Sequence, residues 1–191
     1  MEYKVVLGTI AIVIAIIGYI PYFKDIYIGK TKPHAYSWLI WTILTGIAFV
    51  GQTTDKAGAG AWVTGVTSLA CLTIFCLALK RGEKNVTTSD KLSLCGAGIA
   101  LLLWYVTSSP LWSIILVTII TVLGYYPTMR KSYRKPYEET MATYIMHVIK
   151  FVIGIIALQN YTIITISYPA ALILMNVSFV GFLINRRAAQ S

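Results

Sequence analysis

The stretch Gly18-Tyr19-Ile20-Pro21 closes a long apolar run and is followed by a short basic loop that contains Lys32-Pro33. A matching stretch, Gly124-Tyr125-Tyr126-Pro127, returns at an offset of 106 residues (124 − 18), and a second basic loop with its own Lys135-Pro136 pair follows it. Each copy has the pattern of an apolar helix that ends at a proline, a basic loop and a new helix. Such a repeated unit in an apolar chain is typical of duplicated membrane transporters.

The composition favours a lipid bilayer over water. Of the 191 residues, 57% are hydrophobic and 12% are charged, whereas soluble domains carry roughly 25% charged and about 45–50% apolar residues. A net charge of +9 would suggest nucleic-acid binding in a soluble fold, but here the basic residues occupy alternate short loops. The three cysteines have neither the number nor the spacing of a disulfide framework or metal site. We expect no cofactor, no metal and no nucleic-acid partner.

Seven apolar segments come near the ~20 residues that a bilayer requires. They run over Val5–Ile20, Ala35–Gly51, Gly58–Leu79, Leu92–Thr107, Leu111–Tyr126, Thr140–Leu158 and Ile163–Ile184. The sequence predicts an all-α integral membrane protein with one membrane domain, in which residues 1–79 and 111–191 form three-helix repeats and residues 80–110 a linker helix. The linker keeps the two repeats parallel, because without it the second repeat would be inserted upside down.

Lysine and arginine are distributed unevenly between the two sides of this layout. Of the 16, only Lys4 and Lys56 fall on one side, Lys150 lies inside a segment, and the remaining 13 fall in the first, third and fifth loops and the tail. The positive-inside rule then puts the N-terminus outside and the C-terminus in the cytoplasm.

These features resemble the PQ-loop superfamily of small membrane transporters, which includes the SWEET sugar transporters. The resemblance rests on Pro21 and Pro127 closing the first and fifth segments, on the basic loops behind them and on the 3+1+3 layout. The loop Gly29–His34, followed by Trp38 and Trp41, is most similar to small bacterial members, which implies a bacterial cytoplasmic membrane. The literal Pro-Gln pair and the acidic residue that proton-coupled members carry inside the bundle are both absent. In this family the prolines serve as hinges; the alternative is that each simply ends its helix.

Lys150 is the most informative single residue. It lies ten residues after Thr140, about 15 Å along a helix and so near the bilayer midplane. Tyr144, His147, Lys150 and Gly154 follow one helical stripe. All seven acidic residues fall in termini, loops or helix ends, so one hypothesis is that an anionic substrate supplies the counter-charge. The alternatives are a lysine kept neutral by burial, or an amine that reaches the membrane interface.

Four further residues complete the expected substrate site. His147 either binds substrate or packs as a neutral, hydrogen-bonded residue. Trp41 lies one turn deeper than Trp38, which we assign to the interfacial belt of aromatic residues. Tyr144 is the counterpart of one of these tryptophans in the second repeat. Asn176 lies deep in the last segment and alone remains of the SWEET-type asparagine pair.

The expected protein is a transporter or facilitator that moves a small polar metabolite, anionic in one interpretation, by alternating access between two three-helix bundles. Its site would comprise Lys150, His147, Trp41, Asn176 and Tyr144. Downhill facilitation is favoured because no carboxylate lies within a segment. The alternative is a membrane receptor or partner-anchoring subunit with the same fold. We expect no enzyme, since neither paired acids nor a nucleophile–base pair is found. A dimer is not required, because one chain contains both repeats.

Overall fold

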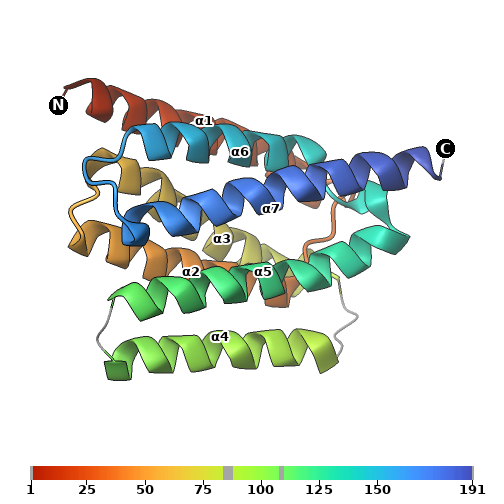
Figure 1. Cartoon of the computed structure of the whole chain (residues 1–191). Coiled ribbons are helices and arrows are strands. Elements are labelled where there is room, and N and C mark those ends of the chain that lie inside the picture. The colour runs from red at the N-terminus through yellow and green to blue at the C-terminus, as the bar shows by residue number, and fades with distance from the viewer. Residues whose placement is uncertain (1, 84–87, 108–109, 191) are drawn as a thin grey trace.

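The computed structural model describes residues 2–83, 88–107 and 110–190 (Figure 1). All regular secondary structure in these ranges is helical, as predicted. The α-helices are α1 (Glu2–Tyr27), α2 (Ala35–Thr54), α3 (Trp62–Arg81), α4 (Thr88–Thr107), α5 (Pro110–Arg134), α6 (Met141–Ile156) and α7 (Ile163–Ala188). Two short 3-10 helices, η1 (Gly58–Ala61) and η2 (Pro136–Glu138), precede α3 and α6.

Among the described residues, four helical stretches are long and apolar enough to cross a membrane, namely α1, α2, the continuous η1–α3 unit and α7. Their outward faces carry large apolar side chains such as Ile16, Leu69 and Leu174, which are exposed by 54%, 66% and 68%. Apolar surface on this scale is unfavourable in water and is the normal lipid-facing surface of a membrane helix. The chain is therefore an integral membrane protein.

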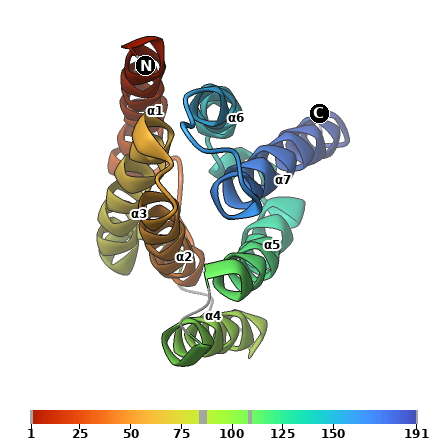
Figure 2. The ribbon, with the colours of Figure 1, turned by 60° about the vertical axis from the view of Figure 1, so that its left-hand side comes forward.

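The helices pack in two groups with α4 at the edge. In the first group α3 contacts both α1 and α2, and in the second α7 contacts both α5 and α6. The groups meet where α1 packs on α6 and where α2 packs on α5. Figure 2 shows the two groups on either side of the bundle, and α4 beside α2 and α5. The interior thus lies between the groups, where side chains from both contribute to one core.

The two prolines of the repeated stretch do not end their helices. α1 continues past Pro21 to Tyr27, and α5 continues through position 127 to Arg134. The prediction that each proline closes a helix is therefore wrong. A membrane helix tolerates proline when its neighbours support the freed backbone; Thr143 of α6 donates a 2.9 Å hydrogen bond to the Gly18 carbonyl in the turn before Pro21.

Candidate functional site

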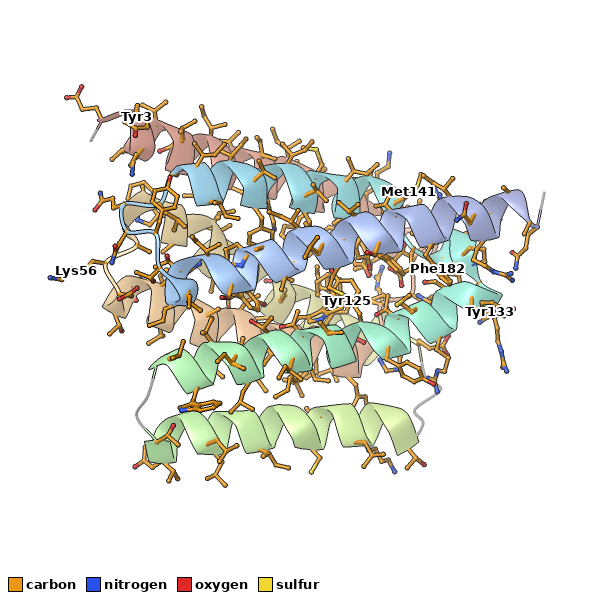
Figure 3. The ribbon with its side chains drawn as sticks, in the orientation of Figure 1. Tyr3, Lys56, Tyr125, Tyr133, Met141 and Phe182 are labelled. Carbon is orange, nitrogen blue, oxygen red and sulfur yellow. The ribbon has the colours of Figure 1, made fainter. Side chains whose placement is uncertain are left out.

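A cavity of about 30 Å³ lies in the middle of the bundle, between the two helix groups. All of its lining residues are buried. Most of them are aromatic. The aromatic residues come from five helices and include Tyr19, Trp41, Tyr125, Tyr144, Phe151 and Tyr168. Tyr125, labelled in Figure 3, lies midway along α5. The volume suffices for about two water molecules.

Three of the predicted site residues, Trp41, Tyr144 and His147, line this cavity. The His147 ring lies 4.9 Å from the Tyr19 ring and 6.0 Å from the Tyr144 ring, centroid to centroid. The Trp41 ring lies 5.0 Å from the Tyr125 ring on α5. The structure therefore brings residues of both helix groups together around one small space.

Trp38 is also a lining residue, and its assignment to the interfacial belt is wrong. Its side chain is 2% exposed, and its ring lies 5.1 Å from that of Tyr22 and 5.0 Å from that of Trp41. Depth along a helix says how near the membrane surface a residue lies but not which face it occupies. The buried face of α2 carries both tryptophans.

Lys150 is fully buried beside the cavity. Its amine donates hydrogen bonds to the Thr67 hydroxyl at 2.8 Å and to the Tyr19 hydroxyl at 3.4 Å. It also lies 4.5 Å from the Tyr19 ring centroid and 4.8 Å from that of Phe151. At 0% exposure the amine does not reach the membrane interface, so that interpretation is wrong. Lys150 itself does not line the cavity, but Thr67, Tyr19 and Phe151, which contact its amine, do.

Several buried polar atoms around the cavity have no hydrogen-bond partner within the part of the chain that the structure describes. At ordinary hydrogen-bond distances these atoms are Trp41 Nε1, His147 Nε2, the Tyr168 hydroxyl and, nearby in the core, Asn176 Oδ1; the His147 side chain interacts with Asn176 and that of Tyr168 with Thr121. Asn176 itself is not a lining residue, and its amide nitrogen donates to the Leu172 carbonyl of its own helix at 2.6 Å. Buried polar atoms are almost always paired with protein or water. Their number here indicates a site that holds water or a small ligand.

Glu139 is a buried carboxylate that sequence reasoning missed. It pairs with Lys131 at 2.7 Å, and the two side chains are only 2% and 4% exposed. It also accepts hydrogen bonds from the Tyr144 hydroxyl at 2.9 Å and the Tyr22 hydroxyl at 3.4 Å. The loop before α6 turns this residue inward while its neighbour Glu138 stays part-exposed. Glu139 lies in the loop before α6, outside the apolar segments as the sequence placed it, but nothing in the sequence distinguishes this buried residue from Glu138.

Further contacts surround Glu139 where α1, α5 and α7 end and α2 and α6 begin, which we call the basic end. The Lys131 amine also donates to the carbonyls of Lys32 and Glu138. The Arg187 side chain donates to the Glu139 carbonyl at 2.7 Å, and Thr140 donates to the Asp25 carboxylate at 2.7 Å. Loops and helix ends of both groups are thus joined by polar and ionic contacts. In Figure 3, Met141 and Tyr133 lie toward this end.

The opposite end, which we call the η1 end, is held by close packing. A Cβ added at Gly60 of η1 would lie 2.7 Å from the Gly154 carbonyl oxygen and 2.8 Å from the Leu158 nitrogen. A Cβ at Gly154 would lie 2.7 Å from Val63 Cγ1 of α3. Backbone therefore meets backbone between the two groups, and only glycine permits this approach. Lys56, at the left in Figure 3, lies at this end.

Among the described residues, no cluster of three or more histidine, cysteine, aspartate or glutamate side chains is arranged to hold a metal ion. Cys71 is buried in the cavity lining, whereas Cys76 and Cys95 are exposed. Comparison of the chain with models of protein families, with curated proteins and with solved structures found no match.

Proposed function

We propose that this protein is a membrane transporter or facilitator, not an enzyme, that moves a small polar metabolite by alternating access. One observation carries the proposal: a cavity with unpaired polar atoms and a buried lysine lies between two helix groups. At its basic end the Tyr22 hydroxyl of the first group donates to the Glu139 carboxylate of the second, and at its η1 end η1 packs on α6. The site is assigned to Lys150, His147, Trp41, Asn176 and Tyr144. The partners are the solute and the bilayer, with no nucleic acid.

The proposal includes seven membrane spans in a 3+1+3 arrangement, with α1–α3 and α5–α7 as repeats and α4 as the linker. The packing supports this, because the third helix of each group contacts the other two. The contacts between groups also correspond. In the proposed repeat α1 is equivalent to α5 and α2 to α6, so the packing of α1 on α6 is equivalent to that of α5 on α2. The PQ-loop resemblance and the parallel repeats of SWEET-type transporters belong to the same proposal.

Residue contacts support the repeat at the same offset as the sequence. Gly18 of α1 faces Met146 of α6, and Gly124 of α5 faces Ile40 of α2. Both the glycines (124 − 18) and their partners (146 − 40) are 106 residues apart. The starts of α2 and α6, at Ala35 and Met141, have the same spacing. A duplication predicts this agreement, because equivalent helices then bury equivalent faces.

In the proposed orientation the basic end faces the cytoplasm of a bacterium and the N-terminus lies outside, as the distribution of lysine and arginine predicts. Exposure of the cavity to the cytoplasm would require separation of Tyr22 from Glu139 and of Thr31 from Thr140. Exposure to the outside would require η1 to part from α6. Pro21 and Pro127 lie within α1 and α5, where a hinge can bend a continuous helix. The sequence argument for downhill facilitation rests on the lack of a carboxylate within an apolar segment, and Glu139 lies in the loop before α6.

Flux measured in proteoliposomes while one end is locked tests this proposal. In a background without native cysteines, Thr31→Cys with Thr140→Cys replaces a 2.8 Å contact between the two groups and would cross-link them at the basic end. Flux of a panel of labelled solutes should stop on oxidation and return on reduction. The control, Lys135→Cys with Glu138→Cys, replaces an i,i+3 ion pair of 3.5 Å and should leave flux unchanged.

The alternative is a receptor or partner-anchoring subunit, and the small volume of the cavity, about 30 Å³ with buried lining residues, favours it. A solute that stabilises the protein but never crosses the membrane would support this alternative. Flux that persists through the Thr31–Thr140 cross-link would overturn the alternating-access proposal.

A further inference from the structure

We infer that the ligand of the central cavity is a small monocarboxylate whose negative charge is recognised through Lys150. This inference rests on the proposed function, because it names the class of solute for the same site.

The first argument is the charge balance of the buried lysines. Lys131 is buried with a carboxylate at 2.7 Å. Lys150 is buried as deeply, but within the described residues it contacts two hydroxyl groups and two aromatic rings, with the Cys71 thiol nearby, and no carboxylate. A buried charge without a counter-ion is costly, and intramembrane charges usually serve a substrate or an ion. Glu139 does not supply the missing charge, because Lys131 already neutralises it.

The second argument is the position of Lys150 relative to the cavity. Thr67, Tyr19 and Phe151 each contact the amine and each line the cavity. The ammonium group is therefore separated from a ligand by a single layer of side chains. A carboxylate in the cavity can accept a hydrogen bond from the Tyr19 hydroxyl, whereas the Thr67 hydroxyl already donates to the Val63 carbonyl at 2.6 Å.

The third argument is the hydrogen-bonding character of the unpaired atoms. Trp41 Nε1 can only donate and has no partner among the described residues. The Tyr168 hydroxyl interacts with the Thr121 side chain but makes no close hydrogen bond. The neutral imidazole of His147 can also donate from its unpaired Nε2. A carboxylate carries about four acceptor sites and no donor. A carboxylate ligand would accept hydrogen bonds from these donors, which explains why they are buried without close hydrogen-bond partners in the protein.

The fourth argument is size. A volume of about 30 Å³ holds about two water molecules. A carboxylate group and a short carbon chain are the largest ligand that fits after small side-chain shifts. The apolar faces of Tyr144 and Phe151 suit the carbon chain. A dicarboxylate or a phosphate ester would need a second cation, and none lines the cavity.

The test compares acids with amides of the same shape. Thermal unfolding of the purified protein in detergent is followed with acetate against acetamide and lactate against lactamide, at constant ionic strength. We expect the acids to raise the unfolding midpoint and the amides to leave it unchanged. Equal stabilisation by acid and amide, or stabilisation by neither, would overturn the inference.

Two variants locate the effect. Lys150→Met keeps the length of the side chain and removes the charge, so lactate should bind at least about tenfold more weakly, the usual effect of losing a hydrogen bond to a charged group. Lys56→Met makes the same charge change at the η1 end and should bind as the parent does. Where Lys150→Met fails to fold, Trp41→Phe removes one donor and should weaken lactate binding severalfold. Unchanged lactate binding by either site variant contradicts the inference.

Flux separates this inference from the proposed function. A transported monocarboxylate carries one negative charge, so an inside-positive potential of 100 mV should raise its accumulation in proteoliposomes roughly 50-fold. Acids that bind but never cross would preserve the carboxylate site and refute transport. Amides or sugars that bind and cross, while acids do neither, would preserve transport and refute the carboxylate.

Discussion

The two ends of the bundle hold the helix groups together by opposite means. At the basic end, the buried Lys131–Glu139 ion pair of the second group binds the first group through the Tyr22 hydroxyl and the Lys32 carbonyl. At the η1 end, Gly60 and Gly154 let the backbones of η1 and α6 approach each other directly. One closure depends on charge and the other on shape.

The difference predicts how each end opens. An ion pair can be exchanged for water, so the basic end has a hydrated alternative in which both charges are solvated. Close packing of glycines in lipid has no such alternative, because the parted surfaces must be filled by side chains, water or lipid. Substitutions that remove one charge should therefore weaken only the basic end. Added methyl groups should disturb only the η1 end.

The largest effect is expected for Glu139→Gln. The substitution leaves the Lys131 ammonium buried without its counter-ion, and breaking one side of a buried pair costs about 3–5 kcal/mol. Unfolding in detergent, monitored by temperature or denaturant, should show a loss of this size. The double variant Lys131→Met/Glu139→Gln removes both charges and should recover most of it. Equal stability of the single and double variants would show that the pair does not hold the basic end.

This same residue marks where sequence reasoning failed. Hydrophobic segments predict where a helix lies, and a loop between two segments is taken as exposed. Glu139 is buried because η2 and the Arg187 contact fold its loop against the ends of α1 and α7. Those contacts join residues about 50 and 117 positions apart, and no local pattern encodes them.

The next effect concerns the η1 end. Gly60→Ala puts a methyl group within 2.7 Å of the Gly154 carbonyl, a backbone atom that cannot rotate away. Overpacking of this kind costs about 1–3 kcal/mol. Gly181→Ala on α7 is the matched control, because nothing lies within 4 Å of its Cβ position, and alanine in an open helical position should stabilise by up to about 1 kcal/mol. Similar unfolding free energies for the two variants would contradict tight packing at the η1 end.

The polar stripe of α6 is where sequence reasoning succeeded. The spacing of Tyr144, His147, Lys150 and Gly154 predicted one buried face, and all four are buried. A charged residue in an apolar segment strongly favours one orientation of its helix, because any other would place the charge against lipid. Trp38 had no such constraint, since tryptophan is compatible with both the interface and the core. The sequence also did not predict that α1 and α5 continue past their prolines. Neighbouring helices support the backbone there, and a local sequence pattern does not show those contacts.

A smaller effect should distinguish Gly18 from Gly124, which are equivalent in the proposed repeat. A methyl group on Gly18 would lie 2.6 Å from Met146 Cβ, which is fixed to the α6 backbone. A methyl group on Gly124 would lie 3.2 Å from Ile40 Cγ2 and from Trp41 Nε1, which can shift. Gly18→Ala should cost about 1–3 kcal/mol and Gly124→Ala less. Because Gly124→Ala moves Trp41, it should alter ligand binding more than stability; the reverse order of unfolding free energies would contradict this geometry.

The smallest effect is expected for Lys135→Gln, at the surface of the basic end. Lys135 pairs with Glu83 at 3.7 Å and with Glu138 at 3.5 Å, and its side chain is 51% exposed. Exposed pairs of this kind contribute about 0–1 kcal/mol, because water solvates the separated charges almost as well. The free energy of unfolding should therefore change by less than about 1 kcal/mol, and high salt should abolish the difference between variant and parent. A loss as large as that of Glu139→Gln would mean that total charge, and not the one buried pair, holds this end together.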